Sequence, residues 1–224
     1  MTDSSVSSNE PGTEAASRQR RTALVVIVAS NLLMSFSFQI WRSLFNNFAV
    51  GELGVQPTQM GWIQFIREVP GLLGFTVGLL ALLMSEMRIA GLSVILMGAG
   101  IALTGGATGL VGLAMSTMVM SIGFHFFMPS NSSMVLQLVG EEETPRLLGR
   151  LNSFGALAAV AGAGAVFLTL DRLGFRTLFY ATGGLMIVGG LVLLPWFRQP
   201  TREAVIEGEK GRAGRRRIPI RRRY

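Results

Sequence analysis

The residues in this sequence that are best able to bind a ligand or transfer a proton lie inside long apolar runs. The stretch QFIREVPGLLG, residues 64–74, places Arg67 beside Glu68, with Pro70 two residues further on. If this run crosses a bilayer, each charge at the membrane centre costs at least about 2.5–3.5 kcal/mol. A charge kept there must therefore bind a solute, form an ion pair or face water.

Two further segments hold polar side chains at membrane depth, FQIWRSLFNN (residues 38–47) and FHFFMPSNSS (residues 124–133). Spacings of i, i+3, i+4 and i+7 bring side chains to one face of a helix. The first segment has this spacing, and so does QFIRE. Together the three segments predict the wall of a polar cavity, with these candidate substrate-binding residues: Gln39, Arg42, Asn46, Gln64, Arg67, Glu68, His125 and Asn131.

The charges in these segments allow two interpretations. Two arginines against one carboxylate leave a surplus cation, which favours an anionic solute or a water-filled cavity. Alternatively, Glu68 neutralises one arginine and ties two helices together. Because neighbouring residues on a helix point about 100° apart, we expect Arg67 and Glu68 to face different neighbours, with Arg42 as the partner of Glu68. His125 is either a proton relay or a hydrogen-bonded packing residue.

The composition is that of an integral membrane protein. Half of the 224 residues are hydrophobic and 15% are charged, against about 25% charged in soluble domains. There are no cysteines, which excludes disulfides and thiolate metal sites, and no other ligand cluster indicates a metal or cofactor. Phosphate-loop, Gly-x-Ser-x-Gly and His-Glu-x-x-His motifs do not occur, so we predict that the protein is not an enzyme.

Apolar runs of about 20 residues predict an all-α membrane protein with six transmembrane helices. The predicted spans are 22–48, 58–84, 89–107, 109–139, 150–170 and 177–197. They form a six-helix domain over 22–197, which follows a disordered cytoplasmic leader over 1–21 and precedes a basic cytoplasmic tail over 198–224.

The positive charges predict the orientation of these spans. Most of the 20 Lys and Arg residues lie before the first span, in the loops that follow the second and fourth spans, or in the tail. The positive-inside rule then places both termini in the cytoplasm of a multi-pass protein of the inner (plasma) membrane. We expect the basic tail to lie against anionic lipid rather than to bind nucleic acid.

This arrangement resembles the amino-terminal half of a major facilitator superfamily transporter, over about residues 20–224. The loop LMSEMRIAG keeps Glu86 and Arg88, which the resemblance makes a cytoplasmic gate, although the Gly-Arg-Arg of the family motif is missing. The segment TPRLLGRLNSFGALAAVAGAGAVF is similar to the family's basic 4–5 loop and glycine-rich fifth helix. The resemblance implies two inverted three-helix units, residues 22–107 and 109–197.

The resemblance also implies a function. Complete family members have two six-helix halves and bind the solute between them near the midplane. We therefore expect a half-sized, split or truncated secondary transporter that moves a small solute, an anion being one candidate, by alternating access. Its partners would be the lipid bilayer, the solute, and a second six-helix half, a second copy or a membrane complex. The alternative is a non-transporting scaffold or assembly factor that docks on a membrane protein complex.

Overall fold

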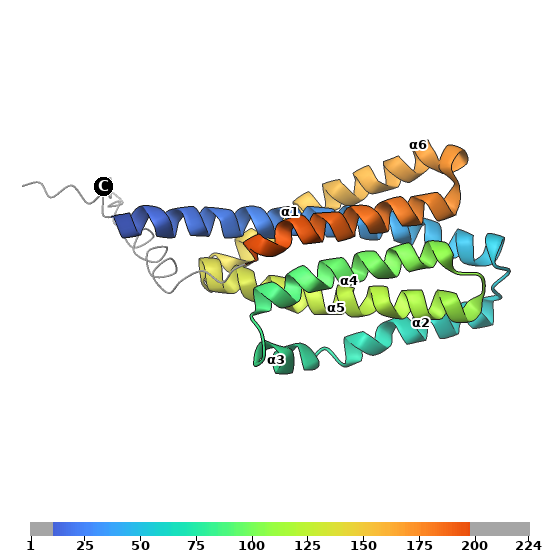
Figure 1. The fold of residues 1–224 in the computed structure, drawn as a ribbon, viewed down its shortest axis with the longest axis horizontal. Coiled ribbons are helices and arrows are strands. Elements are labelled where there is room, and N and C mark those ends of the chain that lie inside the picture. Colours follow the sequence, from blue (N-terminus) through green and yellow to red (C-terminus); the bar gives the residue numbers. More distant parts are fainter. Residues whose placement is uncertain (1–10, 198–224) are drawn as a thin grey trace, which may run out of the picture.

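The computed structural model describes residues 11–197, and the regular elements of this range are all helices (Figure 1). The predicted basic tail and residues 1–10 of the predicted leader lie outside it, whereas residues 11–21 belong to the first helix. The elements are α1 (Pro11–Asn47), the π-helix η1 (Phe48–Glu52), α2 (Pro57–Leu72), α3 (Thr76–Ala81), α4 (Glu86–Gly106), α5 (Leu110–Val139), α6 (Thr144–Leu193) and the 3-10 helix η2 (Leu194–Trp196).

Four helical stretches of the described range are long and apolar enough to cross a membrane. They are Ser17–Glu52, Glu86–Gly106, Leu110–Val139 and Thr144–Trp196. The described range is thus all-helical, as expected for a multi-pass membrane protein, and the division into six spans stays a prediction.

The predicted continuous span over 58–84 is interrupted. Helix α2 ends at Leu72, and the short helix α3 begins at Thr76 after a turn. Pro70 lies inside the last turn of α2 and removes one backbone donor from it, and Gly71 and Gly74 have low helix propensity. These three residues weaken the helix at this point, and beyond Leu73 the backbone changes to i→i−3 hydrogen bonds such as that from Gly74 to Gly71.

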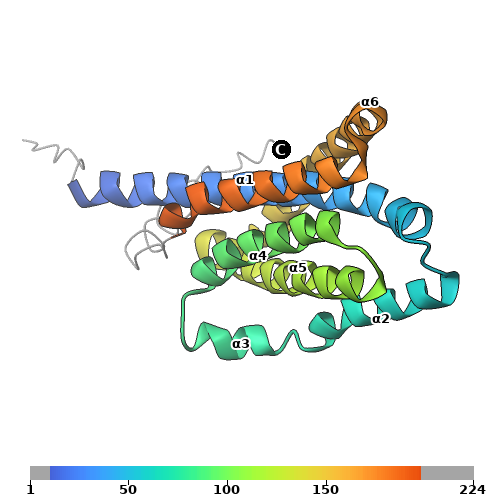
Figure 2. The ribbon, with the colours of Figure 1, turned by 45° about the vertical axis from the view of Figure 1, so that its right-hand side comes forward.

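The long helix α6 consists of two arms that join at Gly174, where the backbone has φ 72° and ψ 167°. Positive φ values are readily adopted only by glycine. The chain folds back at this point, so that the arm 175–193 runs in the direction opposite to the arm 144–173 (Figures 1 and 2). The first arm includes the predicted fifth span, and the second arm covers the predicted sixth span up to residue 193.

Helix α4 lies at the centre of the bundle, between α5 and α6. Small residues allow close contact: a Cβ added at Gly98 would lie 2.7 Å from the Cβ of Met186 on α6. On the side facing α1, the indole N–H of Trp41 donates a hydrogen bond to the hydroxyl of Thr104 on α4 (3.3 Å). This buried bond fixes the C-terminal half of α1 against the core.

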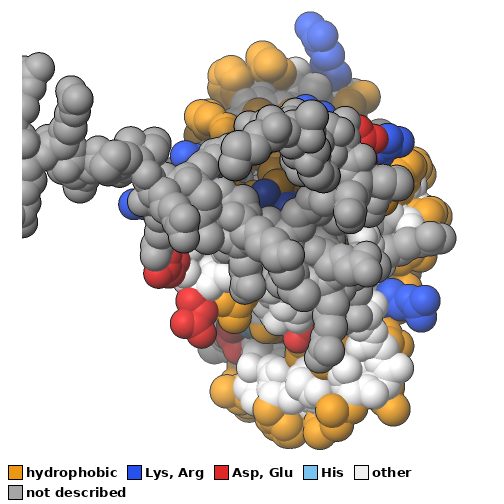
Figure 3. Space-filling view, turned by 90° about the vertical axis from the view of Figure 1, so that its left-hand side faces the viewer, with side chains coloured by type: hydrophobic (Ala, Val, Ile, Leu, Met, Phe, Trp, Pro, Cys, Tyr) orange, Lys and Arg blue, Asp and Glu red, His pale blue; other side chains and the backbone are white. Residues whose placement is uncertain are grey.

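The bundle is apolar on the outside. Exposed side chains along its length include Leu72, Leu83 and Phe167, which are 76%, 82% and 84% exposed. Charged side chains are visible at the end of the bundle where α1 begins, with hydrophobic ones around the margin (Figure 3). An apolar exterior with charged ends is the surface that a bilayer requires.

Candidate functional site

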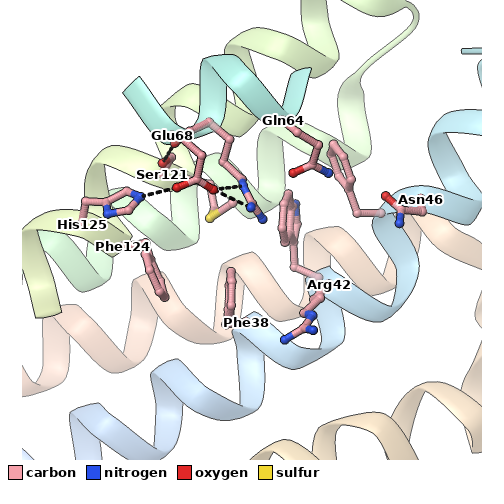
Figure 4. A pocket seen from close by; sticks show the side chains of 12 residues that line it. Phe38, Arg42, Asn46, Gln64, Glu68, Ser121, Phe124 and His125 are labelled. Atoms are coloured by element: carbon pink, nitrogen blue, oxygen red, sulfur yellow. Dashed lines mark hydrogen bonds and ion pairs between the residues drawn. The ribbon is translucent and has the colours of Figure 1, made fainter. Parts of the chain in front are cut away.

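A cavity of about 470 Å³ lies between α1, α2 and α5 (Figure 4). Helices α1 and α5 contribute both polar and apolar side chains to it, and α2 contributes polar ones alone. Its lining residues are Phe38, Trp41, Arg42, Phe45, Asn46, Gln64, Arg67, Glu68, Met120, Ser121, Phe124 and His125.

Six of the eight predicted substrate-binding residues line this cavity, and two do not. Gln39 lies on the flank of α1 and donates a hydrogen bond to Ser43 of the same helix (3.1 Å). Asn131 is buried, 5% exposed, and its side-chain oxygen has no hydrogen-bond partner among the described residues. It follows His125 by six residues, which turns it about 120° away from the cavity face of α5.

The polar face of α2 is set by its helical spacing. Gln64, Arg67 and Glu68 share the cavity side, whereas Trp62 and Phe65 point outward and are 66% and 58% exposed. The hydroxyl of Ser121 on α5 donates to the backbone carbonyl of Arg67 and so ties the two helices together. The charges are thereby held away from the lipid-facing side of α2.

The expected ion pair between Glu68 and Arg42 is wrong for this structure. Glu68 pairs with its neighbour: its Oε1 atom lies 2.6 Å from Nη2 and 3.1 Å from Nε of Arg67. The side chains of Arg67 and Glu68 do leave the helix in different directions, as expected for neighbouring residues. The arginine side chain is long enough, however, to bring its guanidinium to the carboxylate. One cation and one anion of the cavity therefore neutralise each other.

Arg42 is left as the surplus cation. Its side chain is exposed at the α1 wall of the cavity, opposite Glu68 and Gln64 of α2 (Figure 4). Within residues 11–197, its guanidinium has no ion pair or hydrogen bond. All of its donors are therefore available to a ligand.

His125 lies at the inner end of the charged group. Its Nε2 atom is 3.8 Å from Oε2 of Glu68, so Glu68 stands between a guanidinium and an imidazole. The ring also packs against the backbone of α2, because a Cβ added at Gly71 would lie 2.7 Å from its Cε1 atom. Both expected roles, proton relay and packing residue, are compatible with this position.

The predicted gate residues are separated in the structure. Glu86, in the first turn of α4, accepts hydrogen bonds from Ser133 (2.6 Å) and Gln137 (2.5 Å) of α5. The side chain of Arg88 is exposed, and only its backbone N–H is capped, by the hydroxyl of Ser85. Glu86 thus joins α4 to α5, and Arg88 has no acidic partner among the described residues.

The sequence interpretation missed the aromatic part of the cavity. Phe38, Trp41 and Phe45 lie on the same face of α1 as Arg42, and Phe124 is contributed by α5. The four α1 residues, the three aromatic ones and Arg42, have the spacing i, i+3, i+4 and i+7, which was a usable signal. Aromatic residues in an apolar span, however, are normally packing or lipid-facing residues. Only the fold shows that this face lines a cavity.

Helices long enough to span a bilayer, an apolar exterior and a polar cavity of solute size are the features of a multi-pass membrane protein with a cavity inside its bundle. A family model described as Major Facilitator Superfamily matches residues 27–223. The chain belongs to this superfamily, and its class is that of membrane transporters for small solutes. No curated protein and no solved structure gives a significant match.

Proposed function

We propose that this chain is one six-helix half of a secondary transporter that moves a small anionic solute by alternating access. The observation that carries the proposal is the unpaired guanidinium of Arg42 in a cavity whose other charges, Arg67 and Glu68, form a pair. A cation that faces a cavity without a partner attracts an anion, and arginine binds carboxylate or phosphate groups in a bidentate manner. The cavity volume of about 470 Å³ is typical of small-molecule sites.

The packing pattern supports two inverted three-helix units, 22–107 and 109–197. Helix α2 packs against α5, and the first arm of α6 packs against α1, where a Cβ added at Gly155 would lie 2.7 Å from the hydroxyl of Ser35. The contact between α4 and the second arm joins the third helices of the two units. If the two units are exchanged, the first, second and third spans take the places of the fourth, fifth and sixth. The contact between the second and fourth spans then becomes the contact between the fifth and first, and the contact between the third and sixth is unchanged. This is the pattern expected for inverted repeats.

A second six-helix unit would complete the site. The cavity has walls from α1, α2 and α5, and a facing unit, either another chain or a second copy, would close it on the remaining side. Glu86 and Arg88 would then act at the cytoplasmic end, and both termini would lie in the cytoplasm of an inner-membrane protein. The scaffold alternative gains no comparable support, because a scaffold does not require an unpaired cation inside the bundle.

The transport proposal is tested with the full chain in proteoliposomes. Uptake is measured for acetate, succinate, inorganic phosphate and benzoate, with choline as the cationic comparison. We expect uptake of at least one anion above that of empty liposomes, and a loss of about tenfold or more in Arg42→Gln, because a charge-assisted hydrogen bond contributes about 1.5–3 kcal/mol. Arg172→Gln, which changes an exposed arginine remote from the cavity, is the matched control. Transport of choline alone, or equal uptake by Arg42→Gln and the wild type, would contradict the proposal.

The proposed orientation is tested with single cysteines, since the sequence contains none of its own. An impermeant thiol reagent applied to intact cells should label Thr108→Cys, between α4 and α5. It should label Glu141→Cys, between α5 and α6, only after the cells are opened. The opposite pattern would reverse the topology.

A further inference from the structure

Five rings form a continuous aromatic chain along the cavity. Ring centroids are 4.4 Å apart for Trp41 and Phe45, 5.9 Å for Phe38 and Trp41, and 4.8 Å for Phe38 and Phe124. The chain ends on His125, which meets Phe124 edge to face at 5.2 Å. It therefore joins α1 to α5 and ends beside Glu68 of α2.

All five rings line the cavity, but they differ in exposure. Trp41 and Phe45 are 1% and 2% exposed, and Trp41 is also held by its hydrogen bond to Thr104. Phe38 and Phe124 are only partly buried and line the cavity from opposite helices (Figure 4). Because Phe38 stacks on both Phe124 and Trp41, the two rings offer the cavity mainly their edges, a rigid apolar surface that loses little side-chain entropy on binding.

The free cation lies close to this surface. Arg42 follows Phe38 by four residues, so the two side chains share one face of α1 and are about 6 Å apart along the helix axis. An aromatic acid spans a similar distance between the middle of its ring and a hydrogen-bonded guanidinium. By contrast, an acid without an apolar body would leave the surface of Phe38 and Phe124 uncovered.

We infer that the solute is a small organic anion with a planar apolar body, such as an aromatic carboxylate. Its acidic group binds to Arg42, and its ring lies against Phe38 and Phe124. The acidic group supplies charge-assisted hydrogen bonds, and burial of the ring supplies a hydrophobic contribution that acetate lacks. This inference rests on the proposed function and names the class of solute for the same cavity.

The test is equilibrium binding to the full chain in lipid nanodiscs, measured by calorimetry with benzoate, acetate and benzyl alcohol. Benzoate should bind at least tenfold more tightly than acetate and more tightly than benzyl alcohol. Arg42→Gln should weaken benzoate and acetate alike. Phe38→Leu and Phe124→Leu, which keep an apolar side chain but remove the ring, should each weaken benzoate at least threefold and leave acetate unchanged.

The matched control is Phe154→Leu, which changes a half-exposed ring of α6 that does not line the cavity. It should alter neither affinity, and unchanged thermal unfolding of each variant shows that the bundle is intact. Equal affinities for benzoate and acetate, both dependent on Arg42, would overturn this inference and leave the proposed function standing. Binding of benzyl alcohol as tight as that of benzoate and independent of Arg42 would overturn both, and failure of all three probes to bind would overturn the inference.

Discussion

The α4–α5 interface and the α2–α3 segment are packed in opposite ways. At the interface the backbones touch: a Cβ added at Gly100 would lie 2.2 Å from the backbone nitrogen of Met120, and one at Gly123 would lie 2.5 Å from that of Met97. In the α2–α3 segment, Cβ atoms added at Gly61 and Gly78 would meet no atom within 4 Å. Glycine thus serves close helix packing in one region and leaves open space in the other.

The difference shows where the protein places its chemistry. The charged pair Arg67–Glu68 lies on α2, which packs mainly against α5 and ends in a broken segment. The tightly packed α4–α5–α6 core carries no charge of the cavity; it supplies the rigid wall from which Ser121, Phe124 and His125 project. Cavity geometry therefore depends on a few contacts between α2 and that wall.

The largest effect is expected from a methyl group inserted into the rigid region. Gly100→Ala forces the Cβ into the backbone of α5, which cannot move without shifting the whole helix, so we expect destabilisation of about 2–3 kcal/mol or more. Thermal unfolding in detergent measures this as a lowered midpoint.

The same substitution in the open region is the control for Gly100→Ala. Gly78→Ala lies in α3 with free space around it, and alanine is favoured over glycine in a helix by about 0.5–1 kcal/mol. The midpoint should therefore stay the same or rise. Equal destabilisation by the two variants would remove the contrast between the regions.

A smaller effect is expected where the two regions meet. In Gly71→Ala the added methyl would lie 2.7 Å from Cε1 of His125, and a side chain can yield where a backbone cannot. Stability should change by less than about 1 kcal/mol, whereas affinity for the transported anion should fall about threefold because His125 is pushed from its place beside Glu68. Calorimetric titration measures the affinity, with Gly61→Ala on the same helix as the control. In a background of His125→Ala, the substitution should have no further effect on affinity, and a persisting loss would contradict the argument.

Much of this arrangement follows from the sequence. The apolar runs predict the helical bundle, and the spacing of Gln64, Arg67 and Glu68 predicts the polar face of α2. The missing parts are those that depend on tertiary contacts. Periodicity could not show that Phe38 faces a cavity rather than lipid. The pairing of Arg67 with Glu68 was also missed, because the direction in which a side chain leaves the helix does not show how far the guanidinium reaches.

The smallest effect concerns the pair that the sequence interpretation assigned incorrectly. The side chains of Arg67 and Glu68 are 28% and 55% exposed, so water weakens their attraction, and exposed pairs contribute about 0.2–1 kcal/mol. A double-mutant cycle with Arg67→Gln and Glu68→Gln should give a coupling of about 0.5 kcal/mol in the free energy of unfolding. The matched cycle pairs Glu68→Gln with Arg42→Gln and should be additive, because these two side chains do not pair.

The two cycles together test the charge balance of the cavity. If Glu68 couples to Arg67 and not to Arg42, the second arginine remains free for an anion, as the proposed function requires. If the coupling appears with Arg42 instead, Glu68 neutralises that cation, and Arg67 becomes the free one. The cavity would then still hold one surplus positive charge, but it would lie on the loosely packed helix α2, away from the ring of Phe38. The anion would remain the expected solute, whereas the argument for an aromatic acid, which depends on the spacing of Phe38 and Arg42, would fail.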